Sequence, residues 1–398
     1  MTTTINNEHK KLNVPNLRFP EFQGEWEEER LADIADLYKG TGISKDQLSD
    51  DGEPCILYGE LYTKYKSETI REVISKTNIN NTKLVRSKAN DVIIPCSGET
   101  AEDIATARCI LKDNILLGGD LNIIRLHGYD GAFMSYQLNG RRKYDIAKVA
   151  QGVSVVHLYS EHLKGVKTIN PCLEEQKKIA KLLSLLDERI ATQNKIIEDL
   201  KKLKCAIIET EYNSKGQEYR IGDIIEQKSL RNKSNLVKTV LSVNNKLGFI
   251  NQDEQFEDRI VASEDTSNYK VVTKDDFAYN PARINVGSIA RLKSYDKGIV
   301  SPMYICFKVT DSIVPEYLES YFATNQFFKE MQKRLEGSVR LCLSFEGLCN
   351  IPVVIPNMDE QAEIGKRIHL LENKIETECN ILSQYEKQKQ YLLRQMFI

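Results

Sequence analysis

The sequence contains nearly the same segment twice. Residues 174–190 read EEQKKIAKLLSLLDERI, and residues 359–375 read DEQAEIGKRIHLLENKI, 185 positions further along the chain. An internal repeat indicates duplicated structural units, so it constrains the fold more than any short motif does. This one predicts two similar halves, each closed by the same kind of helix.

Further matches between the halves extend beyond the two helices. At the same offset the matched residues are Asp91 and Asp276, Ile104–Ala105 and Ile289–Ala290, Gly152 and Gly337, Leu158 and Leu343, Leu163 and Leu348, and Pro171 and Pro356. Each half also opens alike, with RLADIADLYKG at 30–40 and RIGDIIEQKSL at 220–230. The order is therefore domain, helix, domain, helix.

Both repeated segments carry a heptad pattern typical of a coiled coil. In the first copy, one track holds Ile179, Leu186, Gln193, Leu200 and Ile207, and the other holds Leu182 or Leu183, Ile190, Ile196 or Ile197, and Leu203. In the second copy, the first track holds Ile364, Leu371, Glu378, Tyr385 and Leu392. Each segment has roughly 40 residues, which is about 60 Å of helix. We expect the two helices to pair; the alternative is two ordinary amphipathic helices packed on separate cores.

A polar residue interrupts each seam at the same repeat position. It is Gln193 in the first helix and Glu378 in the second. A polar seam residue costs stability but can fix the register of a coiled coil. Pro171 and Pro356 precede the helices and fit a junction between strand and helix, because proline is tolerated at a helix start.

The segments between the helices have a different pattern. Short apolar runs such as DVIIPC, NILLGGDLNIIRL and GIVSPMYICFKV are separated by Gly, Asn, Asp and Pro. Such runs predict strands, and helical patterns follow late in each segment. The fold class is therefore α+β, with two pseudo-repeated mixed α/β domains joined by two long antiparallel helices that form a coiled-coil spacer. Two similar domains on a stiff spacer suit two similar sites, such as inverted half-sites on duplex DNA.

Composition is that of a soluble globular protein with two or three domains. Charged residues make up 28% and hydrophobic residues 41% of the 398 residues. No apolar run approaches a bilayer span, and the start MTTTINNEHKK lacks the apolar core of a signal peptide. The nine cysteines form no CxxC pair. Reduced thiols in a cytoplasmic protein are expected.

Charge is unevenly distributed along the chain. The formal net charge of −2 gives no overall attraction to nucleic acid. Residues 21–36 are acidic, whereas residues 139–148 and 228–246 are basic. A patchy surface of this kind is compatible with DNA binding on one face.

These features together resemble the specificity subunits of type I restriction–modification systems. The resemblance spans nearly the whole chain. It rests on VPNLRFPEFQGEWEEERLADIADLYKGTG at 14–42 and on two similar endings, GVSVVHL with INPCLEEQKKIAKLLSLLDERI and GSVRLCL with VIPNMDEQAEIGKRIHLLENKI. The second half reads IIEQKSLR where the first has LYKGTG, and the first half lacks the arginine found in GSVRL.

The resemblance implies that separate subunits recognise, methylate and cut the DNA. Each variable half would be a target recognition domain that reads one part of a bipartite target in double-stranded DNA. The helices would set the spacer and dock two modification (methyltransferase) subunits, and restriction (translocase/nuclease) subunits would complete the enzyme. The chain itself would be non-catalytic and hold no cofactor, with S-adenosylmethionine, ATP and Mg²⁺ bound by the partner subunits.

On this interpretation the domain boundaries follow the repeat. We expect an N-terminal tail at 1–17, recognition domain 1 at 18–170, the first spacer helix at 171–212, recognition domain 2 at 213–355 and the second spacer helix at 356–398. The spacer and partner-binding residues are expected to be Glu175, Gln176, Ile179, Leu186, Ile190, Glu360, Gln361, Ile364, Leu371 and Ile375.

A search for catalytic motifs favours a binding protein. Gly40-Thr41-Gly42 is too short for a cofactor loop, and Asn280-Pro281-Ala282-Arg283 is only half of a methyltransferase motif. No GxxxxGK[ST] phosphate loop occurs, and none of the five histidines has a partner at metal-ligand spacing. The two competing hypotheses are a degenerate methyltransferase or nuclease, and a coiled-coil structural adaptor that does not read DNA.

Base reading needs Arg, Lys, Asn or Gln on loops or helix ends, and phosphate contacts also use Ser and Thr. In the first half the candidates are Tyr58, Lys64, Lys66, Ser97, Thr100, Arg141, Arg142, Lys143, Gln151 and Ser154. In the second half they are Lys228, Arg231, Lys233, Asn244, Asn245, Lys246, Arg283, Asn285, Ser338 and Arg340. Arg283 and Arg340 are the strongest, because each stands on a Gly- or Pro-marked loop of the repeat.

Overall fold

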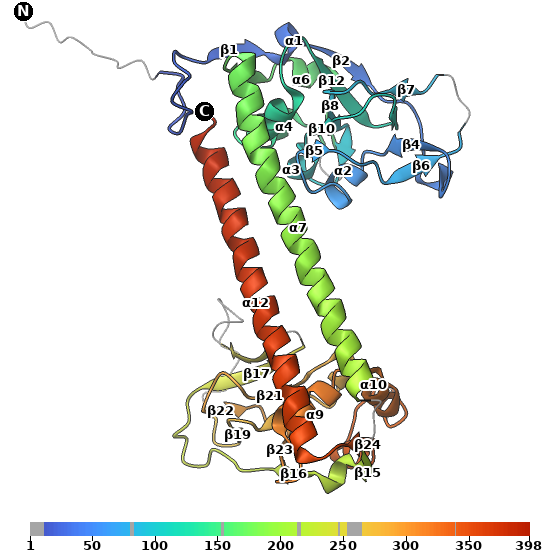
Figure 1. Cartoon of the computed structure of the whole chain (residues 1–398), viewed down its shortest axis with the longest axis vertical. Coiled ribbons are helices and arrows are strands. Elements are labelled where there is room, and N and C mark those ends of the chain that lie inside the picture. Colours follow the sequence, from blue (N-terminus) through green and yellow to red (C-terminus); the bar gives the residue numbers. More distant parts are fainter. Residues whose placement is uncertain are drawn as a thin grey trace, which may run out of the picture. The chain divides into compact units, whose positions relative to one another are not determined.

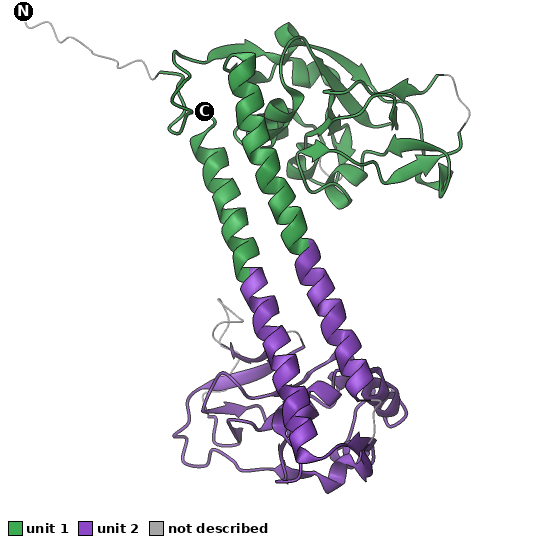
Figure 2. Cartoon of the chain, in the orientation of Figure 1, with its two compact units in different colours: residues 1–194, 380–398 green, residues 195–379 purple. Residues whose placement is uncertain are grey.

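The computed structural model describes residues 12–79, 83–152, 155–212, 216–245, 247–252, 265–338 and 340–398. The chain divides into two compact units (Figure 2). Unit 1 comprises residues 1–194 and 380–398, and unit 2 comprises residues 195–379. Each unit therefore combines a domain with parts of both long helices.

Unit 1 is a mixed α/β domain followed by the start of the first long helix (Figure 1). Its strands are Glu27–Arg30 (β1), Ala35–Lys39 (β2), Leu48–Ser49 (β3), Glu53–Ile56 (β4), Thr69–Ile70 (β5), Ser75–Thr77 (β6), Val85–Arg86 (β7), Val92–Pro95 (β8), Ser97–Gly98 (β9), Arg108–Ile110 (β10), Leu116–Leu117 (β11), Leu121–Leu126 (β12), Val156–His157 (β13) and Lys167–Asn170 (β14). Its helices are Leu31–Ile34 (α1), Lys45–Gln47 (η1, 3₁₀), Glu60–Thr63 (α2), Ala101–Ile104 (α3), Gly131–Asn139 (α4), Lys143–Val149 (α5) and Ser160–Lys164 (α6), and Leu173–Glu211 (α7) leads on into unit 2.

Unit 2 is also a mixed α/β domain, and fewer strands are described in it than in unit 1. Its strands are Gln217–Arg220 (β15), Ile225–Lys228 (β16), Val240–Asn244 (β17), Gly248–Asn251 (β18), Lys270–Thr273 (β19), Phe277–Tyr279 (β20), Ile289–Arg291 (β21), Lys297–Val300 (β22), Ile305–Val309 (β23) and Pro352–Ile355 (β24). Its helices are Ile221–Asp223 (η2, 3₁₀), Ile284–Val286 (η3, 3₁₀), Pro315–Tyr321 (α9), Asn325–Gln332 (α10) and Phe345–Cys349 (α11), and Met358–Gln395 (α12) leads back into unit 1.

The sheets repeat from one unit to the other, which confirms the predicted duplication. The order β2-β12-β8-β10 in unit 1 corresponds to β16-β23-β20-β21 in unit 2, and β1-β14 corresponds to β15-β24. The second sheet of each unit has a parallel pair, β4 with β11 and β17 with β22. Unit 1 adds β5 beside β10.

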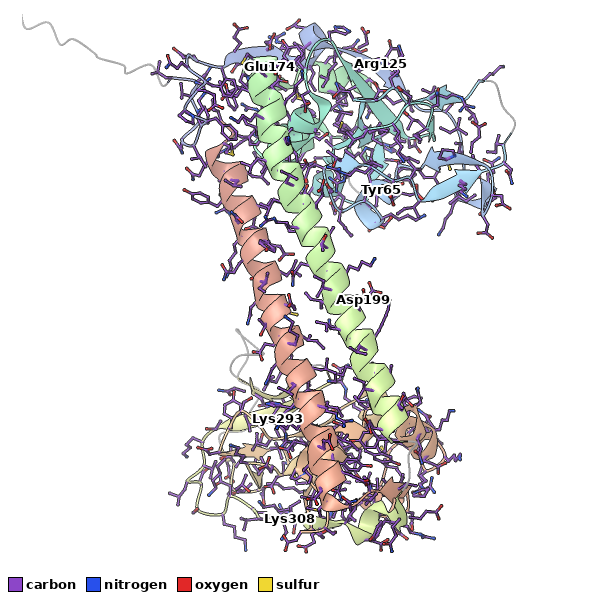
Figure 3. The ribbon with its side chains drawn as sticks, viewed as in Figure 1. Tyr65, Arg125, Glu174, Asp199, Lys293 and Lys308 are labelled. Carbon is purple, nitrogen blue, oxygen red and sulfur yellow. The ribbon has the colours of Figure 1, made fainter. Side chains whose placement is uncertain are left out.

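The turns that precede β8 in unit 1 and β20 in unit 2 share a side-chain hydrogen bond and a left-handed residue. Asp91 accepts a hydrogen bond from the Lys88 amide at 2.8 Å, and Asp276 accepts one from the Thr273 amide at 2.5 Å. The residues before them, Asn90 and Asp275, have φ values of 80° and 69°. Asn and Asp tolerate this left-handed conformation better than other side chains do. Arg125 on β12 (Figure 3) forms an ion pair of 2.7 Å with Asp91, which directly precedes the neighbouring strand β8.

The long helices α7 and α12 run antiparallel within each unit. In unit 2 the ion pairs are Lys204–Glu372 and Glu211–Arg367, and in unit 1 Asp187 pairs with Lys389. In unit 1, Ile179 and Leu183 also share a core cluster with Met396 and Phe397. Among the described residues, no helix combines the length and apolarity needed to cross a membrane.

The predicted seam is correct in one track and partly wrong in the other. Ile179, Leu186 and Gln193 are 1%, 6% and 7% exposed, as expected for inward positions. In the second track the buried residues are Leu183 and Ile197, whereas Leu182, Ile196 and Leu203 are 36%, 39% and 48% exposed. Continuing the buried heptad from Ile197 places Lys204 in the seam, so the expectation for Leu203 was wrong.

Candidate nucleic-acid interface

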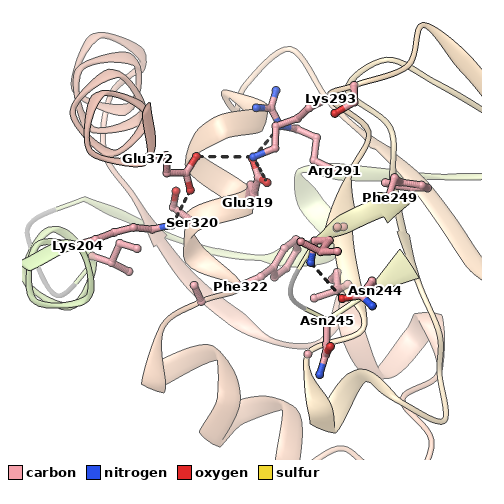
Figure 4. Close-up of a pocket in the computed structure, with 18 residues that line it drawn as sticks. Lys204, Asn244, Asn245, Phe249, Arg291, Lys293, Glu319, Ser320, Phe322 and Glu372 are labelled. Carbon is pink, nitrogen blue, oxygen red and sulfur yellow. Dashed lines mark hydrogen bonds and ion pairs between the residues drawn. The ribbon is translucent and has the colours of Figure 1, made fainter. Parts of the chain in front are cut away.

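Three turns lie next to one another at one end of the domain in unit 2. They comprise residues 244–248, 280–288 and 336–342, with 246 and 339 outside the described part, and we call them the unit 2 edge. The Ser288 hydroxyl donates to the Val243 carbonyl at 3.2 Å, and Gly287 lies against Asn245. The Leu343 amide donates to the Pro281 carbonyl at 3.1 Å. Asn244 and Asn245 from the first turn are visible in Figure 4.

Unit 1 builds the same edge from matching segments, residues 58–63, 96–103 and 151–157, with 153 and 154 outside the described part. The Leu158 amide donates to the Cys96 carbonyl at 2.8 Å, which is the hydrogen bond that Leu343 and Pro281 form in unit 2. Burial raises the pKa of Tyr62, and the neighbouring Tyr58, Asp103 and Glu99 raise it further, so the first two segments are close together. We call these segments the unit 1 edge.

The third segment of each edge is a loop closed by a β-bridge. Gln151 bridges to His157, and Glu336 bridges to Cys342. The glycine that follows has a φ of 126° at Gly152 and 118° at Gly337. A Cβ atom on Gly337 would lie 2.4 Å from the Arg340 carbonyl oxygen. Glycine is therefore required at this point of the loop, which explains its recurrence in the repeat.

About half of the residues predicted to contact DNA lie on the two edges. The predicted residues on them are Tyr58, Ser97, Thr100, Gln151, Asn244, Asn245, Arg283, Asn285, Ser338 and Arg340. Arg283 and Arg340 are exposed, and their guanidinium groups make no hydrogen bond or ion pair to any described residue. Thr100 instead caps α3, accepting from the Asp103 amide at 3.1 Å. Ser154 and Lys246 lie outside the described residues.

Two lysines that were predicted to contact DNA form ion pairs and hydrogen bonds within their own domain. Lys64 binds Glu60 at 2.6 Å and Ser75 at 2.7 Å, and Lys228 binds Asp276 and, at 2.8 Å, Thr273. These two lysines bridge neighbouring structural elements through part-buried hydrogen bonds. These contacts give both lysines a structural role, and their contact with DNA stays a prediction.

The basic segment at 141–143 lies against the C-terminal end of α12, and its contact with DNA stays a prediction. The Arg141 guanidinium donates to the Arg394 carbonyl at 2.7 Å, and Arg142 donates to the Ile398 main-chain oxygen at 3.3 Å. Carbonyl groups at a helix C-terminus lack intrahelical donors, and these arginines supply them to the end of α12. Lys143 begins α5 directly after them.

Three other predicted cations lie outside the edges. Lys66 donates to the Tyr62 carbonyl at 3.2 Å. Arg231 donates to Asn268 and forms a bridge with Lys270 at the start of β19, the strand at the far side of the sheet from β18. Lys233 follows Arg231 on the same segment and is exposed.

The repeated Glu-Gln pairs attach each long helix to its own domain. Gln176 accepts from the Asp130 amide at 2.9 Å and donates to the Pro171 carbonyl at 2.8 Å. Gln361 accepts from the Val314 amide at 2.8 Å and donates to the Pro356 carbonyl at 3.0 Å. Each glutamine therefore ties the start of a long helix to the start of α4 or α9.

This attachment corrects the expectation that the Glu-Gln pairs present a surface to a partner. Gln176 and Gln361 are each 1% exposed, and the buried Glu175 binds Arg18 through two hydrogen bonds of 2.7 and 2.8 Å. Glu360 alone is exposed, in the first turn of α12. Glu174, which precedes Glu175 in α7 and corresponds to Asp359, is labelled in Figure 3.

Sequence reasoning missed two exposed leucines on the long helices. Leu185 on α7 and Leu370 on α12 are 48% and 58% exposed and occupy the same repeat position. The repeat offset alone could have found them. Within the described residues no cluster of His, Cys, Asp and Glu is arranged to hold a metal ion.

Each unit also has a cleft where its domain meets the long helices. In unit 2 a cavity of about 380 Å³ is lined by Lys204 and Glu372 from the helices and by Asn245, Lys293 and Glu319 from the domain (Figure 4). In unit 1 the matching cleft is lined by Asp187 and Lys389 from the helices and by Ser67 and Glu68 from the domain.

Comparison with known proteins agrees with this geometry. The family model described as "Type I restriction modification DNA specificity domain" matches residues 23–202 and again residues 213–387. The type I restriction enzyme MjaVIII specificity subunit of Methanocaldococcus jannaschii is 25% identical over 95% of this chain and 92% of its own. The putative type I restriction enzyme MjaX specificity subunit of the same organism is 22% identical over 97% and 96%.

Solved structures share the fold. The crystal structure of a type I restriction–modification system S subunit from M. genitalium has a TM-score of 0.61 and 18% identity, and covers 97% of this chain and 99% of its own. A chain from a study of complex assembly and conformational transition in the type I R-M system has a TM-score of 0.53 and 12% identity, over 94% and 97%.

Proposed function

The chain belongs to the type I restriction modification DNA specificity family and is a specificity subunit, and we propose that each of its units reads one half of a bipartite DNA target. The observation that carries the proposal is the duplicated edge. Two domains present three corresponding segments, of which the second and third are joined by the same backbone hydrogen bond and the third is closed by the same β-bridge. These segments carry side chains able to contact bases and phosphates.

The two edges differ in the chemistry they offer. The unit 2 edge presents Arg283, Arg340 and Asn245, which carry donors suited to guanine, adenine and phosphate. The unit 1 edge presents Tyr58, Gln151 and the exposed Glu99. A carboxylate can accept from the amino group of cytosine but repels phosphate, so the two halves should read different bases.

We further propose that the chain has no catalytic role of its own. Two modification subunits would methylate the DNA with S-adenosylmethionine, and restriction subunits would use ATP and Mg²⁺ to translocate and cut it. The complex would work in the cytoplasm. The exposed Leu185 and Leu370 support two partner contacts, because equivalent apolar positions on two helices offer similar surfaces to two copies of one partner.

The discriminating experiment measures DNA binding by the chain assembled with its modification subunits. Specific binding to one bipartite duplex should weaken as salt rises, because phosphate contacts release counterions. A structural adaptor would bind the same partners and show no such DNA affinity. Assembly without salt-dependent DNA binding would therefore reject the proposal.

A further inference from the structure

A lysine occupies the same seam position in both long helices. On α7, Leu183, Ile190 and Ile197 precede Lys204 at seven-residue intervals. On α12, Ile368, Ile375 and Leu382 precede Lys389 in the same way. The repeat offset of 185 relates Lys204 to Lys389, so the substitution of lysine into an aliphatic track occurs twice.

In unit 1 this lysine joins three parts of the structure. The Lys389 ammonium lies 2.6 Å from Asp187 on α7 and 2.6 Å from Glu68 in the domain. The Lys389, Asp187 and Glu68 side chains are only 16%, 7% and 10% exposed. Asp187 also accepts from the Tyr136 hydroxyl at 2.7 Å and from Ser67 at 2.9 Å. Both helices and the recognition domain therefore meet at one ion cluster.

In unit 2 the same two repeat positions form the same pair. Lys204 lies 2.6 Å from Glu372, which corresponds to Asp187. Glu372 lies 3.7 Å from Lys293 of the domain, and Lys293 lies 2.8 Å from Glu319 (Figure 4). In unit 1 the carboxylate is on α7 and the lysine on α12, whereas in unit 2 the carboxylate is on α12 and the lysine on α7. This exchange is expected when two repeated helices pair antiparallel.

A charged group in a seam restricts which alignments are possible. Burial lowers the pKa of Lys389, but Glu68 and Asp187 raise it above its ordinary value, so the ammonium stays charged at neutral pH. A shift of α12 by one heptad would move that charge about 10 Å away from Asp187 and Glu68 and leave these buried carboxylates without their cation, which is costly. A lysine at one seam position is known to specify register for this reason.

We propose that Lys204 and Lys389 are positioning residues that align α7 with α12 and seat each recognition domain on the helix pair. The length of the gap that the enzyme accepts between its half-sites then depends on them. This inference rests on the proposed function, because a gap exists only if both units read DNA.

The test replaces Lys204 by leucine in the full chain assembled with its modification subunits. Glu372 keeps Lys293 nearby, so the Lys204→Leu variant retains a folded unit 2 and a packed seam. Methylation is measured on targets with the native gap and with gaps one base pair shorter and longer. We expect discrimination between these gaps to fall about tenfold, which corresponds to roughly 1.4 kcal/mol. In unit 1 the matching variant combines Lys389→Met with Asp187→Asn and Glu68→Gln.

Two further variants make the result specific. Lys195→Leu removes an exposed lysine from α7 and should discriminate gaps as the wild type does. Lys204→Glu and Glu372→Lys should each lose discrimination, and the double variant should regain it, which general destabilisation would not produce. Unchanged discrimination in all Lys204 variants would overturn the inference while leaving the proposed function intact. A wild-type complex that methylates no bipartite target would refute the proposed function instead.

Discussion

Arg283 combines the features expected of a base-reading residue. It is exposed, it follows Asn280 and Pro281 on the middle turn of the unit 2 edge, and its guanidinium has no partner among the described residues. Its amide donates to the Asn280 carbonyl at 3.0 Å, which fixes the backbone from which the side chain extends. A fixed backbone and a free guanidinium suit bidentate recognition of guanine.

We predict that Arg283→Ala weakens binding to the half-site of unit 2 by roughly 1–3 kcal/mol and relaxes its sequence preference. Affinity of the assembled complex for duplexes altered in either half-site measures this. Lys274→Ala is the control, because this exposed lysine precedes β20 whereas Arg283 follows it. Equal affinity and equal preference in Arg283→Ala and the wild type would exclude a base contact.

Gly337 allows a second prediction at the residue scale. Its φ of 118° is rarely adopted by other residues, and a Cβ would meet the Arg340 carbonyl oxygen. Gly337→Ala should therefore cost about 1–3 kcal/mol of loop strain and displace Arg340. The half-site of unit 2 should be bound less tightly, with a smaller effect on thermal unfolding than on binding.

Gly42→Ala is the control, because no atom beyond its chain neighbours lies within 4 Å of the point that its added methyl group would occupy. Matching behaviour of the two variants would contradict the strain argument.

At the scale of elements, Gln176 explains why the Glu-Gln pair is repeated. Gln176→Ala would leave the Asp130 amide and the Pro171 carbonyl without partners in a buried junction. We expect the free energy of unfolding to fall by roughly 1–3 kcal/mol. Chemical denaturation monitored by circular dichroism measures it. Lys177→Ala, which removes only an exposed ion pair with Glu174, should change stability by about 0–1 kcal/mol. Similar losses in both variants would refute the role of Gln176.

The long helices allow a prediction about spacing. Removing one heptad from α7 together with the matching heptad from α12 shortens each helix by about 10 Å. This length corresponds to about three base pairs at 3.4 Å per step. We expect the gap in the methylated target to shorten by that amount, read from methylation of a library of gap lengths. A target whose gap stays unchanged would exclude the helices as the ruler.

Much of this element-level organisation was predictable from sequence because it is repeated. The offset of 185 identified the long helices and matched Asp91 with Asp276 and Gly152 with Gly337, which the structure places in corresponding turns and loops. Periodicity could not separate Leu203 from Lys204, because a heptad pattern allows either of two adjacent positions to face the partner helix. The choice of Lys204 depends on Glu372, a carboxylate 168 positions away, and such a contact has no local signal.

The interface was predictable only in part for a related reason. Residue type suggested Arg141 and Arg142 as well as Arg283 and Arg340, and only the Gly- or Pro-marked loops of the repeat ranked the second pair higher. Folding brings the C-terminal end of α12 against the first pair and leaves the second pair on exposed turns. A composition argument therefore identifies candidate cations, and the fold decides which of them are free to meet DNA.

At the scale of the whole molecule, duplication is the property that links fold to function. Two α/β units share sheet order, edge hydrogen bonds and seam lysines, yet differ in the side chains on their edges. A shared frame with divergent edges suits a reader of two different short sequences, with a gap set by helices that belong to both units.

The most direct test of this account is base-resolution mapping of DNA methylation in the host, with the gene for this chain intact and deleted. We predict that deletion abolishes methylation at one bipartite motif, consisting of two short defined parts around a gap of fixed length. Identical methylation in both strains, in cells that express the chain and its modification subunits, would contradict the claim that the chain selects the DNA target.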